Sequence, residues 1–215
     1  MVAQVAQPVL VSLNGEEGRQ KDVFRKMMRF TAFITFPLLF GFGLVAKEFI
    51  VTAIGEKWLA SAQLIQILCI SGATMPLSTL FSNMIISKGR SGTFFWCTFT
   101  LGLVQIATMV LIWPMGIRTM VIAYTLLNTS WLLVWLFFVR RLIGYGYWMF
   151  FCDVMPFALA AAGVMGVAYI ATMPLSNLIA LLISRFIIAV VLYYVVMKIA
   201  RVKILAECER FVKRG

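Results

Sequence analysis

The stretch LFSNMIISKGRSGTFFWCTF (residues 80–99) places two cations in a short polar turn between long apolar runs. Lys88 and Arg90 stand beside glycine and serine, residues that favour turns. A water-soluble helical hairpin and a membrane hairpin share this pattern. They differ in the length and polarity of the flanking runs, so the composition of the whole chain decides between them.

That composition is typical of a membrane protein. Of 215 residues, 62% are apolar and 13% are charged, and the mean hydropathy is +0.97. Soluble domains carry about a quarter charged residues, which cover their surface. The net charge of +11 does not indicate nucleic-acid binding, because the cations are confined to short segments between apolar runs instead of being spread over a folded surface.

Six apolar runs are long enough to cross a bilayer, which takes about 20 helical residues. They cover residues 30–53, 60–86, 93–115, 117–139, 149–172 and 175–198. The loops between them are short, so consecutive helices are antiparallel neighbours. The sequence therefore predicts an all-α, polytopic membrane protein with six transmembrane helices.

The positions of lysine and arginine predict the orientation of these helices. Fifteen of the 19 cations fall on one side, and positive loops stay cytoplasmic. The connections on that side contain Lys88 and Arg90, and Arg140 and Arg141, which we take as the topology-determining residues. The segment before the first span and the segment after the last span are then both cytoplasmic. Only Lys47, Lys57 and Arg118 fall on the opposite side.

No enzyme signature is present, so we expect neither catalysis nor a cofactor. The chain has no histidine, and its four cysteines lack zinc-ligand spacing, which excludes a Cys/His metal site. It also lacks a phosphate-binding glycine loop followed by lysine. None of the eight acidic residues sits at the centre of a predicted span. Transport and membrane scaffolding remain as functions.

Polar residues within the spans are the candidates for a substrate path. Along the second span, polar residues are spaced by three to five at Gln63, Gln66, Ser71, Thr74, Ser78 and Ser82. The candidates taken from the second and fourth spans are Gln66, Thr74, Ser78, Ser82, Asn83 and Asn128. One interpretation has these faces lining a hydrated cavity. The alternative is hydrogen bonding between helices, worth about 1 kcal/mol or less per contact.

Arg185 is the cation that lies deepest within a predicted span, near the bilayer midplane. A central arginine is costly and is expected to face protein or water. The favoured interpretation is an ion pair with Asp153, which lies at the cytoplasmic start of the fifth span. The alternatives are contact with an anionic ligand and snorkelling of the side chain.

Two long segments carry a family resemblance: TFPLLFGFGLVAKEFIVTAIGEKWLASAQLIQILCISGA (35–73) and MPLSTLFSNMIISKGRSGTFF (75–95). Together they resemble the polysaccharide (O-unit) flippases of the multidrug/oligosaccharidyl-lipid/polysaccharide exporter superfamily. The shared features are the FP at a helix start, the GEKW outer turn and the GR turn. The resemblance runs from about residue 7 to 140.

The resemblance implies a transporter that moves a polyprenyl-pyrophosphate-linked oligosaccharide across the bacterial inner membrane by alternating access between two helical bundles. Six spans are about half of what that family needs. The implied organisation is the C-terminal part: the end of a truncated helix and a basic linker (1–29), four helices of the C-terminal bundle (30–141), an accessory helix pair (142–200) and a basic tail (201–215).

The implied partners are the lipid bilayer, the lipid-linked oligosaccharide, and either an N-terminal bundle absent from this sequence or polysaccharide assembly proteins. Two other functions remain open. One is a non-transporting membrane scaffold, in which the polar faces are dry and packed. The other is a multidrug-type antiporter of the same superfamily, which would require an acidic residue deep in a span.

Overall fold

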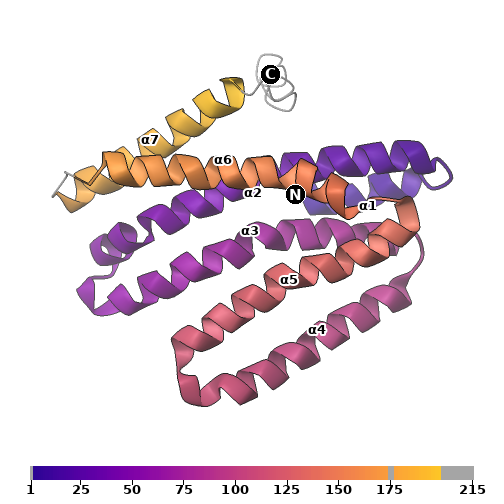
Figure 1. The fold of residues 1–215 in the computed structure, drawn as a ribbon, viewed down its shortest axis with the longest axis horizontal. Helices are drawn as coiled ribbons and strands as arrows, with labels where there is room; N and C mark the ends of the chain where they lie inside the picture. Colours follow the sequence, from indigo (N-terminus) through magenta and orange to yellow (C-terminus); the bar gives the residue numbers. More distant parts are fainter. Residues whose placement is uncertain (1, 174–176, 200–215) are drawn as a thin grey trace. The chain divides into compact units, whose positions relative to one another are not determined.

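The computed structural model describes the chain at residues 2–173 and 177–199. Seven α-helices follow one another along it, with bounds Val2–Ser12 (α1), Glu17–Ala53 (α2), Leu59–Ser87 (α3), Ser91–Ile112 (α4), Ile117–Ile143 (α5), Tyr147–Ala171 (α6) and Leu178–Ile199 (α7) (Figure 1). Two short 3₁₀ turns, Glu56–Trp58 (η1) and Trp113–Met115 (η2), precede α3 and α5. The described residues contain no strand, and the predicted all-α class is confirmed.

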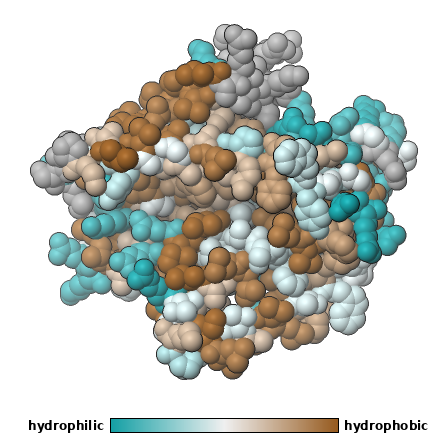
Figure 2. Space-filling view, in the orientation of Figure 1, coloured by the Kyte–Doolittle hydropathy of each residue, from teal (hydrophilic) through white to brown (hydrophobic). Residues whose placement is uncertain are grey.

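Six of these helical segments are long and apolar enough to cross a membrane: Gly18–Ala53, Glu56–Ser87, Ser91–Met115, Ile117–Ile143, Tyr147–Ala171 and Ala180–Ile199. They coincide with the six predicted spans. Many of their large apolar side chains point away from the protein, among them Val110, Leu111 and Leu126. Hydrophobic residues cover much of the face seen in the space-filling view (Figure 2). Such exposure suits a bilayer, where apolar side chains contact lipid without cost.

The basic segment before the first span differs from the predicted linker. Helix α2 runs for 37 residues from Glu17, so residues 17–29 are its first turns and are continuous with the span. The arginines and lysines in it lower the local hydropathy, but they are good helix formers. For this reason hydropathy placed the start of the helix too late. The predicted tail (201–215) lies outside the described residues.

The chain forms two compact units. Unit 1 comprises residues 1–35 and 67–155, and unit 2 comprises residues 36–66 and 156–215. Helices α2, α3 and α6 each run from one unit into the other, because the boundaries fall within them. This division differs from the sequence-based one, which separated residues 30–141 from an accessory pair at 142–200. It groups α7 and most of α6 with the end of α2 and the start of α3 instead of setting the last two helices apart.

Aromatic residues form the centre of unit 1. Phe24 of α2, Phe81 of α3 and Tyr145 of the α5–α6 loop are fully buried. The ring centroid of Phe24 lies 5.8 Å from that of Phe81 and 5.4 Å from that of Tyr145. The rings of Phe24 and Tyr145 meet edge to face. Phe150 of α6 adds a further contact with Phe81 at 5.8 Å. These edge and tilted contacts are favoured geometries for aromatic pairs, and they join four elements of unit 1.

Hydrogen bonds join the connections at one end of unit 1. The Asn14 side chain in the α1–α2 turn donates to the carbonyl of Ser87 at the end of α3, at 2.7 Å. The fully buried Gln20 donates to the Leu10 carbonyl at 2.7 Å and to the Asn14 side chain at 3.1 Å. The α1–α2 and α3–α4 turns, both predicted to be on the cytoplasmic side, therefore lie together.

The SKGRSG turn is built on Gly89. Helix α3 ends at Ser87 and α4 begins at Ser91. Gly89 has a φ of 71°, a left-handed conformation that suits glycine, and Arg90 N–H bonds back to the Ile85 carbonyl at 3.1 Å. This is the glycine-capped helix end known as the Schellman motif. The predicted tight turn is confirmed.

Candidate functional site: a polar and aromatic cavity

A cavity of about 620 Å³ lies between α3, α4 and α5, entirely within unit 1. Helices α4 and α5 form an antiparallel hairpin (Figure 1). Each of the three helices contributes one stripe of side chains to the wall. The volume falls within the range of about 300–1,000 Å³ found for small-molecule sites.

The α3 wall is polar and contains four of the predicted path residues. Thr74, Ser78, Ser82 and Asn83 line the cavity, together with Ser71. The hydroxyl groups donate to carbonyls of their own helix: Thr74 to Ser71 at 2.8 Å and Ser82 to Ser78 at 3.0 Å. Their donor hydrogens are therefore occupied by the backbone, while the hydroxyl oxygens retain acceptor capacity.

The α5 wall combines one amide with three aromatic residues. Tyr124, Asn128, Trp131 and Trp135 line the cavity at spacings of four, three and four, which places them on one helical face. The predicted path residue Asn128 is thus in the wall, and its side-chain nitrogen donates to the Tyr124 carbonyl at 2.9 Å. Phe94 of α4 stacks on Trp135 with ring centroids 6.1 Å apart.

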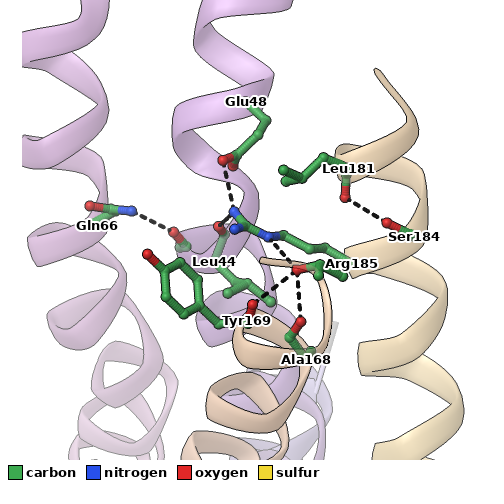
Figure 3. A network of polar contacts seen from close by, with 10 residues as sticks. Leu44, Glu48, Gln66, Ala168, Tyr169, Leu181, Ser184 and Arg185 are labelled. Carbon is green, nitrogen blue, oxygen red and sulfur yellow. Dashed lines mark hydrogen bonds and ion pairs between the residues drawn. The ribbon is translucent and has the colours of Figure 1, made fainter. Parts of the chain in front are cut away.

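Gln66 is the predicted path residue that the structure places elsewhere. It belongs to unit 2, where its side chain donates to the Gly43 carbonyl of α2 at 3.1 Å (Figure 3). It does not line the cavity of unit 1. Sequence spacing put Gln66 on the same stripe, but its side chain bonds to a neighbouring helix instead.

Sequence reasoning missed the aromatic side of this cavity. The predicted path residues were all polar, and Trp131 and Trp135 of the fourth span were not among them. The signal was present in the regular spacing of Tyr124, Asn128, Trp131 and Trp135. Ligand sites are lined mainly by aromatic and apolar side chains with a few polar groups. Aromatic residues on the same helical face as a polar residue therefore indicate a ligand site better than the polar residue by itself.

A second polar site in unit 1 surrounds the fully buried Asp153 of α6. Its carboxylate accepts bonds from Arg25 Nε at 2.9 Å and Arg29 Nε at 2.6 Å, both on α2. Arg25 also donates through Nη2 at 3.1 Å, and the Tyr145 hydroxyl donates at 3.2 Å. Burial, followed by the neighbouring Asp153 charge, raises the pKa of Tyr145 above its usual value, so the phenol stays protonated and donates.

The residues predicted to determine the topology lie at helix ends of unit 1. Lys88 is in the α3–α4 turn and Arg90 precedes the first residue of α4. Arg140 and Arg141 are in the last turn of α5, where a positive charge interacts favourably with the helix dipole. Their guanidinium groups also lie over aromatic rings, Arg140 5.6 Å from the Tyr147 centroid and Arg141 4.3 Å from that of Phe137.

Arg185 is the centre of the polar network in unit 2 (Figure 3). It is buried, and its Nη1 lies 2.7 Å from Glu48 Oε1 on α2. The same nitrogen donates to the Leu44 carbonyl at 3.4 Å, and Nε donates to the Thr172 hydroxyl after α6 at 3.0 Å. The guanidinium carbon also lies 4.8 Å from the Tyr169 ring centroid. One side chain of α7 thus contacts α2 and the end of α6.

The favoured pairing of Arg185 with Asp153 is therefore wrong. Asp153 bonds to Arg25 and Arg29, and Arg185 bonds to Glu48. Sequence reasoning placed Asp153 as the acid nearest to Arg185 along the last two helices. The partner is Glu48, which stands beside Lys47 on α2, 137 residues away in the sequence.

Two acids are consequently buried within span helices, whereas the sequence suggested no deep acid. Glu48 is 5% exposed and Asp153 is fully buried. Both are bound by arginine, so neither stands as an isolated intramembrane charge, which would be costly. Among the described residues, no cluster of histidine, cysteine and acidic side chains has the makings of a metal site.

Comparison with known proteins connects this architecture to polysaccharide biosynthesis. A family model described as "Polysaccharide biosynthesis protein" matches residues 1–63. Teichuronic acid biosynthesis protein TuaB of Bacillus subtilis is 27% identical over 164 residues, 75% of this chain and 34% of that protein. Lipopolysaccharide biosynthesis protein WzxC of Escherichia coli is 23% identical over 90 residues, 42% of this chain and 18% of that protein.

The predicted resemblance is confirmed. The chain is similar to proteins named for the biosynthesis of polysaccharide, teichuronic acid and lipopolysaccharide. An uncharacterised membrane protein in the cps region of Klebsiella pneumoniae is 29% identical over 90 residues, 42% of this chain and 19% of that protein. The chain spans about a third or less of the length of the curated relatives it matches. No solved structure matches it.

Proposed function

We propose that this chain forms part of a flippase that carries a lipid-linked oligosaccharide across the inner membrane during the export of a surface polysaccharide. The glycan passes along the cavity of unit 1, and the lipid chain stays in the bilayer beside the protein. Alternating access between two helical bundles, of which this chain supplies one side, moves the cavity opening from one leaflet to the other.

The observation that carries this proposal is the uncharged polar wall of α3 within a chain of six span-length helices. A glycan crossing the hydrocarbon core needs hydrogen-bond partners, because each unpaired polar group costs several kcal/mol. Thr74, Ser78 and Ser82 supply hydroxyl oxygens along about two turns of the helix. Neutral partners bind weakly enough to release the glycan on the far side.

The charged groups support transport of a glycan over exchange of a cation. A cation antiporter of the related type needs a carboxylate that is free to bind its ion. Asp153 is held by two arginines, and Glu48 is held by Arg185. The uncharged cavity of unit 1 contains neither of them.

Cysteine accessibility tests whether the cavity is hydrated. In a background from which the four native cysteines have been removed, Ser78→Cys, Ser82→Cys and Asn128→Cys are expected to react with a charged, water-soluble thiol reagent in intact cells. Ser130→Cys is the matched control, because Ser130 lies on the same helix as Asn128, is exposed, and does not line the cavity. In the proposed arrangement Ser130 contacts lipid, so its cysteine is expected to remain unlabelled.

Equal protection of all four cysteines would contradict the transport path and favour the scaffold function, in which the polar face is packed and dry. Addition of lipid-linked oligosaccharide to inverted membrane vesicles should protect the three cavity cysteines. Labelling that is insensitive to this substrate would indicate a hydrated cavity that serves another ligand.

The orientation is a further part of the proposal. Reporter fusions after Gly89 and Arg141 are expected to give a cytoplasmic signal, and fusions near Glu56 and Gly116 an external one, because positive connections remain inside. The contacts between the α1–α2 and α3–α4 turns support a shared side for these connections. A cytoplasmic signal at Glu56 would overturn the orientation. The predicted external site near Pro174 falls outside the described residues.

A further inference from the structure

We infer that the cavity of unit 1 binds an uncharged pyranose ring, with one ring face stacked on Trp131 next to the buried Trp135 and its hydroxyl groups donating to the α3 wall. This inference rests on the proposed function and narrows it. It assigns the selection of the sugar to two tryptophans of α5, and it excludes acidic substituents and the carrier phosphates from this cavity.

The aromatic wall provides the stacking surface. Trp131 and Trp135 are one helical turn apart, and both line the cavity. Trp135 is buried and is held by the stacked ring of Phe94, which restricts its orientation. Many pyranose rings have an apolar face of axial C–H bonds. The face of an aromatic ring carries negative charge density and attracts such weakly positive hydrogens.

The opposite wall has the hydrogen-bonding polarity that sugar hydroxyls need. Ser71, Thr74 and Ser82 donate their own hydrogens to backbone carbonyls of α3 at 2.8–3.1 Å. Their oxygens are left as acceptors, so the complementary ligand group is a donor. A hydroxyl is such a donor. A carboxylate or phosphate is only an acceptor and finds few available donors on this wall.

Charge leads to the same conclusion. None of the residues that line the cavity is Lys, Arg, Asp or Glu. The basic residues of unit 1 gather instead around Asp153 and at the helix ends. Moving a carboxylate into an uncharged cavity without a paired cation is strongly unfavourable. An acidic substituent on the glycan must therefore stay outside this cavity while an uncharged ring occupies it.

The inference is tested by saturation-transfer-difference NMR. The sample is the full-length protein, purified from the cell and reconstituted in lipid nanodiscs. Methyl β-D-glucopyranoside and methyl β-D-glucopyranosiduronate are the probes, since they differ only in the hydroxymethyl group and the carboxylate. We expect saturation of the axial ring protons of the neutral glycoside, and binding of the uronate that is weaker by about tenfold or more.

Trp131→Leu and Trp135→Leu are each expected to weaken binding of the neutral glycoside by roughly two- to tenfold. Trp131→Phe should retain most of the binding of the neutral glycoside. Trp96→Leu is the control, because Trp96 is an exposed tryptophan of α4 that does not line the cavity. A correctly folded Trp131→Phe protein shows that any loss in Trp131→Leu reflects the ring and not misfolding.

Three results would overturn the inference. These are equal binding of the two glycosides, unchanged binding in both leucine variants, and no saturation transfer to either glycoside from the wild-type protein. Suppose that neither glycoside shows saturation transfer but that substrate still protects the cavity cysteines from labelling. The transport path would then be supported, and the proposed sugar site would be contradicted. If the cavity cysteines remain unlabelled whether or not substrate is present, the transport path itself is contradicted.

Discussion

Replacing Arg25 and Arg29 together with alanine is expected to lower the yield and thermal stability of the folded protein more than replacing Asp153 with alanine. Asp153 is fully buried, so the double variant leaves a buried carboxylate that keeps its bond from the Tyr145 hydroxyl but has lost both guanidinium groups. Removing the partner of a buried charge costs about 3–5 kcal/mol. The measurement is the apparent melting temperature in detergent, together with the amount of protein in the membrane.

The smaller effect expected for Asp153→Ala than for the double arginine variant follows from the exposure of the arginines. The side chains of Arg25 and Arg29 are 29% and 43% exposed, so both guanidinium groups can become hydrated when Asp153 is removed. The loss is then about 1.5–3 kcal/mol, that of hydrogen bonds to charged groups. Adding Asp153→Ala to the double arginine variant should recover stability, because it removes the unpaired charge.

Arg19→Ala is the matched control for this experiment. Arg19 lies on the same helix and is 3.2 Å from Glu16, but the two side chains are 69% and 60% exposed. Such surface pairs contribute about 1 kcal/mol or less, so no measurable shift is expected. An equal shift in Arg19→Ala and in the double arginine variant would contradict the role assigned to Asp153.

Arg185→Ala is expected to destabilise the protein by about 3–5 kcal/mol, because it leaves Glu48 buried without its partner. Glu48 Oε2 has no hydrogen-bond partner among the described residues, so the carboxylate already depends on the bonds made through Oε1. Glu48→Gln should be milder, since the amide oxygen still accepts a bond from Arg185. The control is Ser184→Ala, because the Ser184 hydroxyl donates to the Leu181 carbonyl of its own helix and takes no part in the ion pair.

Double variants separate this network from the one around Asp153. Glu48→Ala and Arg185→Ala should be far from additive, since both remove the same ion pair, whereas Arg185→Ala and Asp153→Ala should add. The opposite pattern would restore the pairing suggested by the sequence. If Arg185→Ala leaves the protein abundant and stable but abolishes polysaccharide export, then Arg185 contacts the ligand instead.

Hydropathy and charge, both local properties, allowed much of the fold to be predicted. The six spans follow from uninterrupted apolar runs of about 20 residues, because every backbone polar group in lipid must be satisfied within the helix. The Gly89 turn follows from a glycine among polar residues. The spacing of Thr74, Ser78 and Ser82 predicted residues of the cavity wall, because helical periodicity determines which side chains share a face.

Only the tertiary structure decided which charges pair. Asp153 meets Arg25 across 128 residues of sequence, and Arg185 meets Glu48 across 137. Gln66 bonds to a carbonyl of a neighbouring helix and does not lie on the predicted stripe. Trp131 and Trp135 line the cavity because α4 and α5 pack against α3. Sequence by itself determined the spans and the charge asymmetry, since these depend on each segment and its solvent. The choice of partners depends on which helices pack together, and no single segment contains that information.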